Sequence, residues 1–485
     1  MRLEQLLDGI YNGKMRDDAK QWPVSFLSCD SREIEKDAMY FALKGQTFDG
    51  ADFVDDVIER GARIIVLNDS LTGFGQNPDV CYLYVEDTNQ FLRQVAKRFF
   101  NNPSERVKAI AVTGTNGKTT ITYMIESILL ATGLECSVIG TVNKRIGEKI
   151  FPSTHTTPGF LDNQKMFYDI AEEGVDYCVM EVSSHALVQG RIDLVEFDTA
   201  IFTNLTGDHL DYHKTMNNYF NAKSILFTDF PTLKNAVINV DDRYGRKLVS
   251  MTSANVLTYG LKNNADITAK DVQLNISGTS LKLNTPDGSA VIRTSLVGEF
   301  NVYNLLAAAA AAFAEGISLD KIKKGIEKMT HVPGRLERID CGQDYSIFVD
   351  YAHTHDALEN VLSAIRKTTD ARVILVFGCG GDRDRTKRPL MGSVADKMAD
   401  FTIVTSDNPR SEDPQGIIDE ILAGFDGNQF TVVVDRKEAI EKALNMAKSG
   451  DVVLVAGKGH EMTQIFKDRV IKFDERQIIR QHLLT

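Results

Sequence analysis

The sequence lacks a cysteine framework, an excess of positive charge and a long apolar run, and each absence excludes a class of protein. Its six cysteines are scattered without a C-x-x-C pair, which argues against both a disulfide framework and a zinc ribbon. The net charge of −12 argues against an extended nucleic-acid-binding surface, although a small anionic ligand needs only a local basic pocket. No apolar stretch approaches the ~18 residues of a membrane span, and the first residues, MRLEQLLDGIYNGK, carry charges throughout, unlike a signal peptide. We therefore expect a cytoplasmic protein with neither a nucleic-acid partner nor a membrane span.

Length and hydrophobic pattern together indicate several α/β domains. The chain of 485 residues has room for about three domains of roughly 150 residues each. Residues 1–107 mix short strands with helical patterns and end in the polar segment NNPSER, which we interpret as a linker. In residues 108–332, strand-like runs alternate with helix-like stretches, which is typical of a parallel sheet. After HVPGR, residues 333–485 repeat this pattern with the apolar runs RVILVFG, FTIVTS, FTVVVD and DVVLVAG, which predict a second doubly wound domain.

Two segments inside residues 108–332 depart from the alternating pattern. Residues 267–298 predict antiparallel hairpins, with PDG as a turn between two strands. The following NVYNLLAAAAAAFAEG contains six consecutive alanines, which we interpret as the close-packed face of a buried helix, since alanine favours helices and lets them approach closely.

Residues 111–120, AVTGTNGKTT, predict a phosphate-binding loop between a strand and a helix. The backbone N–H groups of Gly114 to Lys118 can converge on phosphate oxygens at the helix N-terminus, Lys118 adds positive charge, and the Thr119 hydroxyl can bind Mg²⁺. The match to the general G-x-x-x-x-G-K-[ST] pattern is partial, because Val112 stands where the first glycine would fall. A tight turn with an exposed lysine is the alternative.

Other chemically active side chains follow strand-like runs in the same domain. The run YCVMEV carries Glu181 near its end, and a carboxylate placed there near Thr119 could hold a Mg²⁺ ion that bridges nucleotide phosphates. His209 and His213 have the i, i+4 spacing of a zinc-protease helix, but the glutamate of H-E-x-x-H is missing. Packing or capping is the alternative for both histidines, and Lys223 considered alone is typical of a solvated helix lysine.

The ends of the C-terminal apolar runs carry the segments GCGGDRDR, DNPRSEDP and GKGHE. Open parallel sheets bind ligands beyond the carboxyl ends of their strands, so we expect these segments to line a ligand site.

A set of motifs spread over nearly the whole chain resembles the Mur ligases of peptidoglycan synthesis. In chain order the motifs are TGTNGKTT, TTP, EVSSHALVQGR, NLTGDHLDYH, FNVYN, VPGR, DYAHT, FGCGGDRDRTKRPLM, DNPRSEDP and AGKGHE. The resemblance implies an α/β fold of three domains, with a central P-loop ATPase-like parallel sheet and a C-terminal Rossmann-like domain. It assigns UDP binding to residues 1–107, ATP binding to residues 108–332 and amino-acid binding to residues 333–485.

The same resemblance implies an ATP-dependent ligase that forms an amide bond. The terminal carboxylate of UDP-MurNAc-L-Ala-D-Glu attacks the γ-phosphate of ATP, and the amine of meso-diaminopimelate then displaces phosphate from the acyl phosphate. Such a step needs positive charge around the transferring phosphoryl group. The implied catalytic residues are Lys118, Glu181, His209 and Lys223, and the implied magnesium ligands are Thr119, Glu181, His209 and Lys223 as a carbamate. A carbamate turns the cationic side chain of Lys223 into an oxygen-bearing anion.

For ATP, the resemblance implies contacts from three further motifs besides the phosphate loop. The implied ATP-binding residues are Gly114, Thr115, Asn116, Gly117, Lys118, Thr119, Thr120, Asn301, Arg335, Asp350 and His353. Arg335, Asp350 and His353 are expected to reach the nucleotide when the third domain closes. His355 replaces a proline that is usual in the DYAHT motif, which leaves His353 in register.

The other two substrates are assigned in the same way. The implied UDP-sugar contacts are Ser31, Thr156, Thr157, Ser183, Gln189 and Arg191, of which Arg191 suits a carboxylate or a phosphate. An ordinary surface arginine is the alternative for Arg191. The implied diaminopimelate contacts are Arg383, Asp407, Asn408, Pro409, Arg410, Gly457 and Glu461, with Lys458 and His460 close by.

The DNPR segment favours diaminopimelate over lysine as the added residue, since lysine-adding relatives lack its arginine. Arg410 can bind the distal carboxylate of diaminopimelate, while Asp407 and Glu461 pair with its distal ammonium group. An unpaired arginine in a closed pocket is penalised by burial, which discriminates against lysine.

Three alternatives stay open on the sequence alone. They are the same ligation with L-lysine, a folylpolyglutamate synthetase with the same fold, and a nucleotide-dependent switch or binding protein. ATP turnover without an amino acid would identify the switch. We expect the protein to be a monomer.

Overall fold

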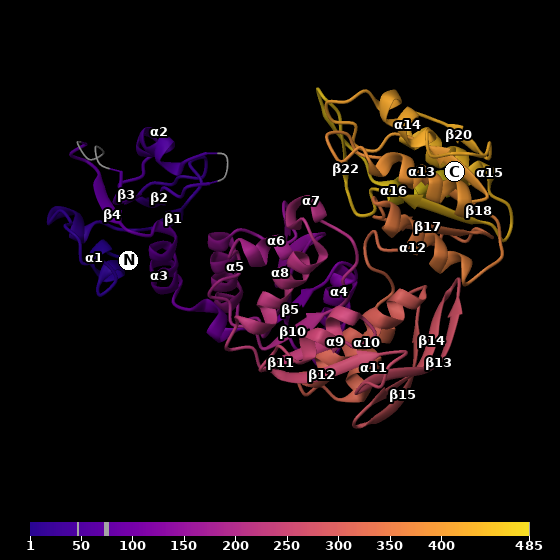
Figure 1. The fold of residues 1–485 in the computed structure, drawn as a ribbon, viewed down its shortest axis with the longest axis horizontal. Helices are drawn as coiled ribbons and strands as arrows, with labels where there is room; N and C mark the ends of the chain where they lie inside the picture. Colours follow the sequence, from indigo (N-terminus) through magenta and orange to yellow (C-terminus); the bar gives the residue numbers. More distant parts are fainter. Residues whose placement is uncertain (46–47, 72–76, 485) are drawn as a thin grey trace.

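The computed structural model describes residues 1–45, 48–71 and 77–484, which form three α/β parts along the chain (Figure 1). The first part, in indigo, is joined through α3 (Thr88–Phe100) to the central part in magenta, and the third part, in orange and yellow, follows it. Each part has its own main β-sheet and its own buried apolar clusters. The predicted α/β fold with three domains is therefore confirmed, while the limits at residues 107 and 332 stay predictions.

The first part contains a small parallel sheet with the strand order β1-β2-β3-β4. Apolar residues such as those of β2 and β3 are buried along their whole length, because helices and turns cover both faces of the sheet. The strands are β1 (Phe26–Ser28), β2 (Ala38–Phe41), β3 (Ile64–Asn68) and β4 (Cys81–Val85). Besides α3, the helices are α1 (Leu3–Leu7), η1 (Asp18–Gln21), η2 (Gly50–Phe53) and α2 (Val54–Glu59).

The central sheet has the strand order β15-β14-β13-β12-β11-β10-β5-β9-β6-β7-β8. Neighbouring strands are parallel from β13 to β6 and antiparallel at both edges, so the predicted hairpins of residues 267–298 form one edge of the sheet. The strands are β5 (Lys108–Thr113), β6 (Cys136–Ile139), β7 (Asn143–Ile146), β8 (Lys149–Pro152), β9 (Tyr177–Glu181), β10 (Thr199–Phe202), β11 (Asn235–Asn239), β12 (Asn255–Gly260), β13 (Ile267–Asn275), β14 (Gly278–Thr285) and β15 (Gly288–Thr294).

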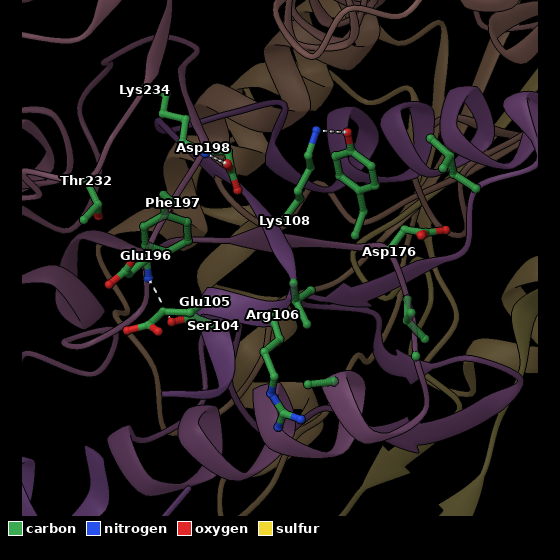
Figure 2. Close-up of a pocket in the computed structure, with 16 residues that line it drawn as sticks. Ser104, Glu105, Arg106, Lys108, Asp176, Glu196, Phe197, Asp198, Thr232 and Lys234 are labelled. Atoms are coloured by element: carbon green, nitrogen blue, oxygen red, sulfur yellow. Dashed lines mark hydrogen bonds and ion pairs between the residues drawn. The ribbon is translucent and has the colours of Figure 1, made fainter. Parts of the chain in front are cut away.

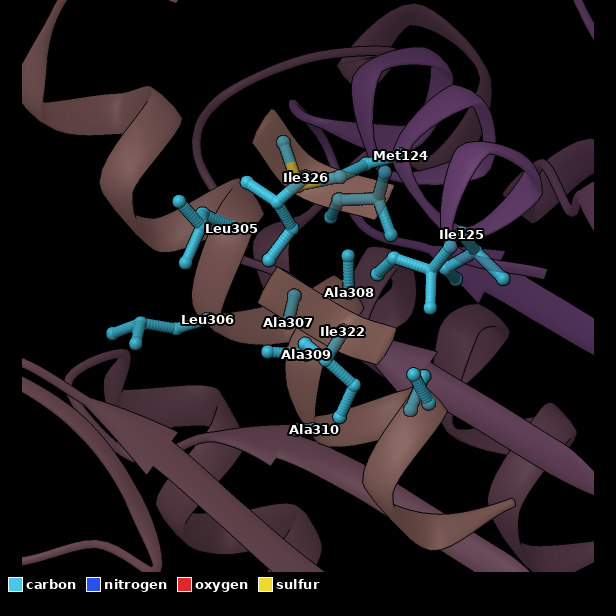
Figure 3. Close-up of a cluster of buried hydrophobic side chains, with 14 of the residues drawn as sticks. Met124, Ile125, Leu305, Leu306, Ala307, Ala308, Ala309, Ala310, Ile322 and Ile326 are labelled. Carbon is cyan, nitrogen blue, oxygen red and sulfur yellow. The ribbon is translucent and has the colours of Figure 1, made fainter. Parts of the chain in front are cut away.

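Helices cover both faces of the central sheet. They are η3 (Pro103–Arg106), α4 (Lys118–Thr132), α5 (Phe160–Glu172), α6 (Ser184–Val188), α7 (Leu210–His213), α8 (Met216–Thr228), α9 (Arg243–Val249), α10 (Glu299–Ala314) and α11 (Leu319–Lys328). The six alanines lie on α10, where each is at most 1% exposed, and α10 packs against α4, α11 and several strands (Figure 3). The expectation of a buried alanine helix is confirmed, and the burial extends around the whole helix because α10 has packed neighbours on every side.

The predicted linker NNPSER is packed against the central part. Pro103 and Ser104 of η3 are buried, and the Ser104 hydroxyl donates to the carbonyl of Leu194 (3.1 Å) while accepting from the amide of Glu196 (3.2 Å). The connection between the first two parts is therefore anchored at its central end.

The third part contains a sheet with the strand order β16-β17-β21-β18-β19-β20, parallel except for β16. The four predicted apolar runs form β18, β19, β20 and β21, while β17 was not identified from the sequence. The strands are β16 (Glu337–Ile339), β17 (Ser346–Asp350), β18 (Val373–Phe377), β19 (Phe401–Val404), β20 (Phe430–Val432) and β21 (Val452–Ala456), with a separate hairpin of β22 (Thr463–Ile465) and β23 (Val470–Lys472). The helices are α12 (His355–Arg366), α13 (Lys387–Met398), α14 (Pro414–Leu422), α15 (Arg436–Met446) and α16 (Glu475–Leu483).

In the described ranges, none of the helices combines the length and the apolar character needed to cross a lipid bilayer.

Candidate active site

The predicted phosphate loop connects β5 to α4, as the sequence indicated. Gly114 has φ +144°, and a Cβ atom there would lie 1.8 Å from the hydroxyl oxygen of Thr203, so only glycine fits. The amide of Thr115 donates to the carbonyl of Asn204 (2.9 Å), and the amide of Asn116 donates to the side-chain oxygen of Asn204 (3.0 Å). The loop is thus held against the segment that follows β10, with Lys118 and Thr119 opening the helix.

Lys118 and Lys223 meet under this loop. The Lys118 ammonium donates to the carbonyls of Gly114 and Thr115, both at 2.9 Å, and the Lys223 ammonium donates to the same Gly114 carbonyl at 2.9 Å. Lys223 is 1% exposed, so it is not the solvated lysine that the sequence alone suggested. Burial lowers the pKa of Lys118, and burial together with the neighbouring Lys118 charge lowers the pKa of Lys223 well below its ordinary value.

Glu181 lies at the carboxyl end of β9, beside the phosphate loop. One carboxylate oxygen accepts from the amide of Thr141 (2.8 Å) and the other accepts from its hydroxyl (3.0 Å). A Cβ atom on Gly140 would lie 2.4 Å from the carboxylate, so this glycine allows the close approach. Thr141 was missed from the sequence, although it follows the apolar run of β6 at the same edge of the sheet as the predicted residues.

His209 caps α7 and is exposed, with φ +54°. Its ring lies 5.0 Å from that of His185. His213 is buried instead: it is hydrogen-bonded to the Ser184 hydroxyl (2.9 Å) and stacks on Tyr219. His213 therefore packs inside the central part, which was the alternative to a metal-binding role. Within residues 1–45, 48–71 and 77–484, no three histidine, cysteine, aspartate or glutamate side chains form a metal-binding group.

The predicted UDP-sugar residues of the central part form one hydrogen-bonded network. The Arg191 guanidinium donates to the carbonyl of Thr157 (3.0 Å) and to the side-chain oxygen of Gln189 (2.8 Å). The Thr157 hydroxyl accepts from the amide of Ser183 (3.0 Å). Thr156 is joined to Glu181 through Thr141, because the hydroxyls of Thr156 and Thr141 lie 3.0 Å apart. Arg191 is therefore not an ordinary surface arginine.

Ser31 lies in the first part, after β1, between Asp30 and Arg32, which form an ion pair of 2.5 Å. In the part of the chain that the structure describes, no hydrogen bond joins Ser31 to the other predicted UDP-sugar residues. Its role stays a prediction.

The FNVYN motif forms the first turns of α10, beside the phosphate loop. The side-chain amide of Asn301 donates to the carbonyl of Val297 (2.8 Å), and its oxygen accepts from Asn304 (3.0 Å). A Cβ atom on Gly117 would lie 2.4 Å from the side-chain oxygen of Asn304. Asn304 is thus the residue of this motif in contact with the loop, and it was not singled out from the sequence. The role of Asn301 in ATP binding stays a prediction.

Arg335 links the third part to the phosphate loop. Its guanidinium donates to the hydroxyl of Thr119 (3.3 Å) and lies 4.9 Å from the ring of Tyr351. Asp350 is buried and accepts from the amides of Leu336 (2.6 Å) and Ala352 (2.7 Å), so it holds the turn that carries Arg335. Burial raises the pKa of Asp350.

His353 and His460 flank Tyr351. The Nδ1 atom of His353 lies 2.9 Å from the carbonyl of Tyr351, and its ring is 4.6 Å from that of the tyrosine. The ring of His460 lies 4.8 Å from Tyr351, and burial lowers the pKa of His460 to about 3, which keeps this imidazole neutral.

The segments DNPR and GKGHE meet at the carboxyl edge of the third sheet. The Asn408 amide donates to a carboxylate oxygen of Glu461 (2.8 Å), and the buried Lys458 ammonium donates both to Asn408 (2.9 Å) and to that oxygen (3.0 Å). A Cβ atom on Gly457 would lie 3.0 Å from the carboxylate of Asp407. The position of Lys458 thereby acquires a structural reason, since it holds Asn408 and Glu461 together.

Arg383 and Arg410 lie above the neighbouring glycine loop. The Arg410 guanidinium donates to the carbonyl of Gly381 (2.8 Å), and a Cβ atom on Gly381 would lie 1.9 Å from the carbonyl oxygen of Pro409. Arg383 is exposed. All the predicted diaminopimelate residues therefore lie on loops that meet at one edge of the sheet.

Two cavities open beside the central part, away from its phosphate loop. A cavity of about 870 Å³ opens at the amino ends of β5, β9 and β10, with Lys108, Asp198 and Lys234 in its wall (Figure 2). The phosphate loop follows the carboxyl end of β5, so this cavity is at the opposite edge of the sheet. A second cavity of about 610 Å³ has Gln189 in its wall.

Comparison with known proteins shows matches along the whole chain. Residues 23–100 match "Mur ligase family, catalytic domain", residues 112–312 match "Mur ligase middle domain" and residues 334–459 match "Mur ligase, glutamate ligase domain". A relative from Clostridium tetani is 43% identical over 99% of this chain and 98% of its own length. The chain belongs to the Mur ligase family.

Two relatives of this Mur ligase carry the same printed name. The Clostridium tetani protein and one from Geobacillus kaustophilus, which is 46% identical over 94% of each chain, are both named UDP-N-acetylmuramoyl-L-alanyl-D-glutamate--2,6-diaminopimelate ligase. A solved structure of a ligase of that name is 33% identical, covers 98% of both chains and has a TM-score of 0.71.

Proposed function

We propose that this Mur ligase uses ATP to join UDP-MurNAc-L-Ala-D-Glu to meso-diaminopimelate through an acyl phosphate, in the cytoplasmic synthesis of peptidoglycan precursors. The observation that carries the proposal is the DNPR segment, whose Arg410 lies beside Arg383 over the glycine loop of the third sheet. Relatives that match over nearly the full chain and bear the name of this activity support it.

The reaction divides into two steps whose atoms balance. A carboxylate oxygen of the dipeptide's glutamate bonds to the γ-phosphorus of ATP while the bond to the β,γ-bridging oxygen breaks, and ADP leaves. The neutral amine of diaminopimelate then bonds to the acyl carbon, phosphate leaves, and the amine loses a proton. Positive charge from Lys118 and Arg335 stabilises the transferring phosphoryl group.

The ATP phosphates bind on the loop of residues 114–120, whose N–H groups open α4. Arg335 approaches from the third part, on a turn held by Asp350. The Arg335 guanidinium lies over the ring of Tyr351, and His353 follows that tyrosine by two residues. Asn304 contacts this loop from α10 and donates to the side-chain oxygen of Asn301, which is proposed to contact the adenine base.

Thr119, Glu181 and His209 are the groups that would hold Mg²⁺. The Thr119 hydroxyl and the Glu181 carboxylate supply the oxygen ligands that such an ion prefers while it keeps several waters, and His209 adds an imidazole nitrogen. When bound, magnesium neutralises negative charge on the phosphates. Thr141 orients the Glu181 carboxylate through two hydrogen bonds.

Lys223 is proposed to react with CO₂ to give a carbamate. Its amine nitrogen bonds to the carbon of CO₂ and loses a proton, which requires the neutral amine. Full burial beside Lys118 favours that neutral form. The resulting carboxylate would sit next to the phosphate loop and could serve the magnesium site.

The muramoyl dipeptide is placed on the network of Thr156, Thr157, Ser183, Gln189 and Arg191, which adjoins Glu181. Arg191 offers a guanidinium to the dipeptide carboxylate or to a phosphate. Ser31 in the first part is proposed to contact the uridine nucleotide, which leaves the sugar and peptide to extend toward the central part.

The distal end of diaminopimelate carries a carboxylate and an ammonium group. Arg383 and Arg410 would bind the carboxylate, while Asp407 and the free oxygen of Glu461 would bind the ammonium group. Asn408 and Lys458 hold Glu461 through its other oxygen. Lysine lacks the distal carboxylate and would leave both guanidinium groups without an anionic partner, which is costly in a closed site.

Phosphate release from ATP tests the proposal, with UDP-MurNAc-L-Ala-D-Glu present and meso-diaminopimelate, L-lysine or no amino acid added. We expect release only with diaminopimelate. Release with lysine instead would show the lysine-adding activity, and equal release without any amino acid would identify a nucleotide-dependent switch. Sedimentation of the pure protein tests the expected monomer.

A further inference from the structure

Arg388, on α13, is a buried cation between the two loops that carry Arg383 and Arg410. Its side chain has no exposed surface. The guanidinium donates to both carboxylate oxygens of Glu412, at 2.8 and 2.9 Å, in a two-pronged arrangement. It also donates to Glu420 (2.8 Å) and to the carbonyl of Gly380 (3.3 Å).

Glu412 connects this cation to both loops. It lies two residues after Arg410, and one of its carboxylate oxygens accepts from the amide of Asp382 (2.6 Å), next to Arg383. Asp382 in turn accepts from the amide and the hydroxyl of Ser411. The amide of Gly381 donates to the carbonyl of Asn408 (2.9 Å), so the two loops are joined at several successive points.

This junction determines where the guanidinium groups of Arg383 and Arg410 lie. A Cβ atom on Gly380 would be 2.9 Å from a terminal nitrogen of Arg410 and 3.9 Å from the Cγ of Arg383, so both side chains lie over the same glycine. The carbonyl of that glycine is the one that Arg388 binds. Displacing Arg388 or Glu412 therefore shifts the backbone at Gly380, against which the side chains of Arg383 and Arg410 lie.

We propose that Arg388 and Glu412 are positioning residues of the amino-acid site, which hold Arg383 and Arg410 in register for one distal carboxylate. The inference rests on the proposed function, because it concerns how that same site selects its amino acid. Neither residue needs to touch the substrate; both act through the loops of residues 380–383 and 408–412. The Arg388 guanidinium also holds the pKa of Glu412 down at about 2, so the pair stays ionised at neutral pH.

Steady-state kinetics of Glu412→Gln and Arg388→Lys test the proposal. Glutamine has one side-chain oxygen and cannot accept from Arg388 as a carboxylate does with two. Lysine keeps the positive charge but lacks the planar guanidinium with two parallel N–H donors. We expect the KM for meso-diaminopimelate to rise at least tenfold in both variants, while the KM values for ATP and UDP-MurNAc-L-Ala-D-Glu stay within twofold. The matched control is Asp400→Asn, which breaks another ion pair of the same domain, Arg366–Asp400 (2.7 Å), and should leave all three KM values within twofold.

A double-mutant cycle with Arg410→Ala separates positioning from a general loss of structure. If Glu412 acts through Arg410, Glu412→Gln adds less than twofold to the diaminopimelate KM of Arg410→Ala. Additive effects, or equal changes in all three KM values, would overturn the proposal. If Arg388→Lys does not fold, Glu412→Gln and the double-mutant cycle still test the positioning role.

The parent protein distinguishes this inference from the proposed function. No stimulation of phosphate release by diaminopimelate in the parent would overturn both. Stimulation in the parent with an unchanged KM in Glu412→Gln would overturn the positioning role alone.

Discussion

The side chains of Lys118 and Lys223 both donate to one acceptor, the backbone carbonyl of Gly114, at 2.9 Å each. Two ammonium groups that share one oxygen repel each other, and burial penalises both charges. Lys223, which is buried more completely, is therefore the one whose pKa falls well below its ordinary value.

Lys223→Ala should lose most of its activity, roughly 100-fold, because one charged group of the phosphoryl-transfer site disappears. Millimolar formate or acetate should restore part of it by filling the vacated space with a carboxylate, as the carbamate proposal requires. Phosphate release with and without the added acid measures both effects. Lys118→Ala serves as the control, since no carboxylate can replace its positive charge. Full activity of Lys223→Ala without added acid would disprove the carbamate.

Arg335→Ala should raise the KM for ATP about tenfold, because a charged hydrogen bond contributes on the order of 1.5–3 kcal/mol. The KM for diaminopimelate should stay unchanged, since Arg335 lies at Thr119 rather than at the DNPR segment. Arg335→Lys should fall between parent and alanine variant. Initial rates at varied ATP measure the effect, and an unaltered ATP dependence in Arg335→Ala would remove Arg335 from the nucleotide site.

The sequence predicted the phosphate loop and the amino-acid site only in part. The strand-loop-helix around Gly114 and the carboxyl-end segments of the third sheet could be predicted, because strand ends and glycine patterns are local features. The resemblance pointed to Lys223, but the burial of Lys223 and of Arg388 could not be predicted, since an isolated lysine or arginine in a helix is usually solvated and its burial depends on residues far along the chain. Thr141 and Asn304 were missed for the same reason: their partners, Glu181 and Gly117, come close only after the sheet and α10 have assembled.

Arg410→Ala should raise the KM for meso-diaminopimelate by roughly two orders of magnitude, because losing one partner of a closed charge pair costs about 2–5 kcal/mol. The rate with L-lysine should change little or rise, since one guanidinium group fewer is then left without an anionic partner. Competition between the two amino acids, with product masses measured, gives the ratio directly. Asp400→Asn is again the control. A parallel loss with both amino acids would mean that Arg410 supports the loop rather than the specificity.

Ala309→Leu should destabilise the central part by about 1–3 kcal/mol, because extra methylenes have no space on a helix with packed neighbours all round. Ala309 has no exposed surface on α10. The matched control is Leu130→Ala on the neighbouring α4, where the side chain is 51% exposed and the change should be within about 0.5 kcal/mol. Urea unfolding followed by circular dichroism measures both, and equal effects would contradict the close packing of α10.

The Arg388–Glu412 pair predicts an acid-sensitive contribution to stability. The pKa of Glu412 falls from 4.5 to about 2 in the folded protein, chiefly because Arg388 donates to its carboxylate. A carboxyl group with a lowered folded-state pKa stabilises the fold fully above its unfolded value, and this contribution is lost as the pH falls through the folded value. The free energy of unfolding should therefore differ most between the parent and Glu412→Gln above pH 4.5 and progressively less toward pH 2.

Urea unfolding of both proteins at several pH values in that range measures the difference. Other carboxylates also titrate there, and Asp400→Asn shows how much another Arg–carboxylate pair contributes on the same scale. A parent-to-Glu412→Gln difference that stays constant from neutral pH down to about pH 2 would mean that the Glu412 charge is not held by Arg388. The loop junction would then depend on its other hydrogen bonds, between Gly381 and Asn408 and between Asp382 and Ser411.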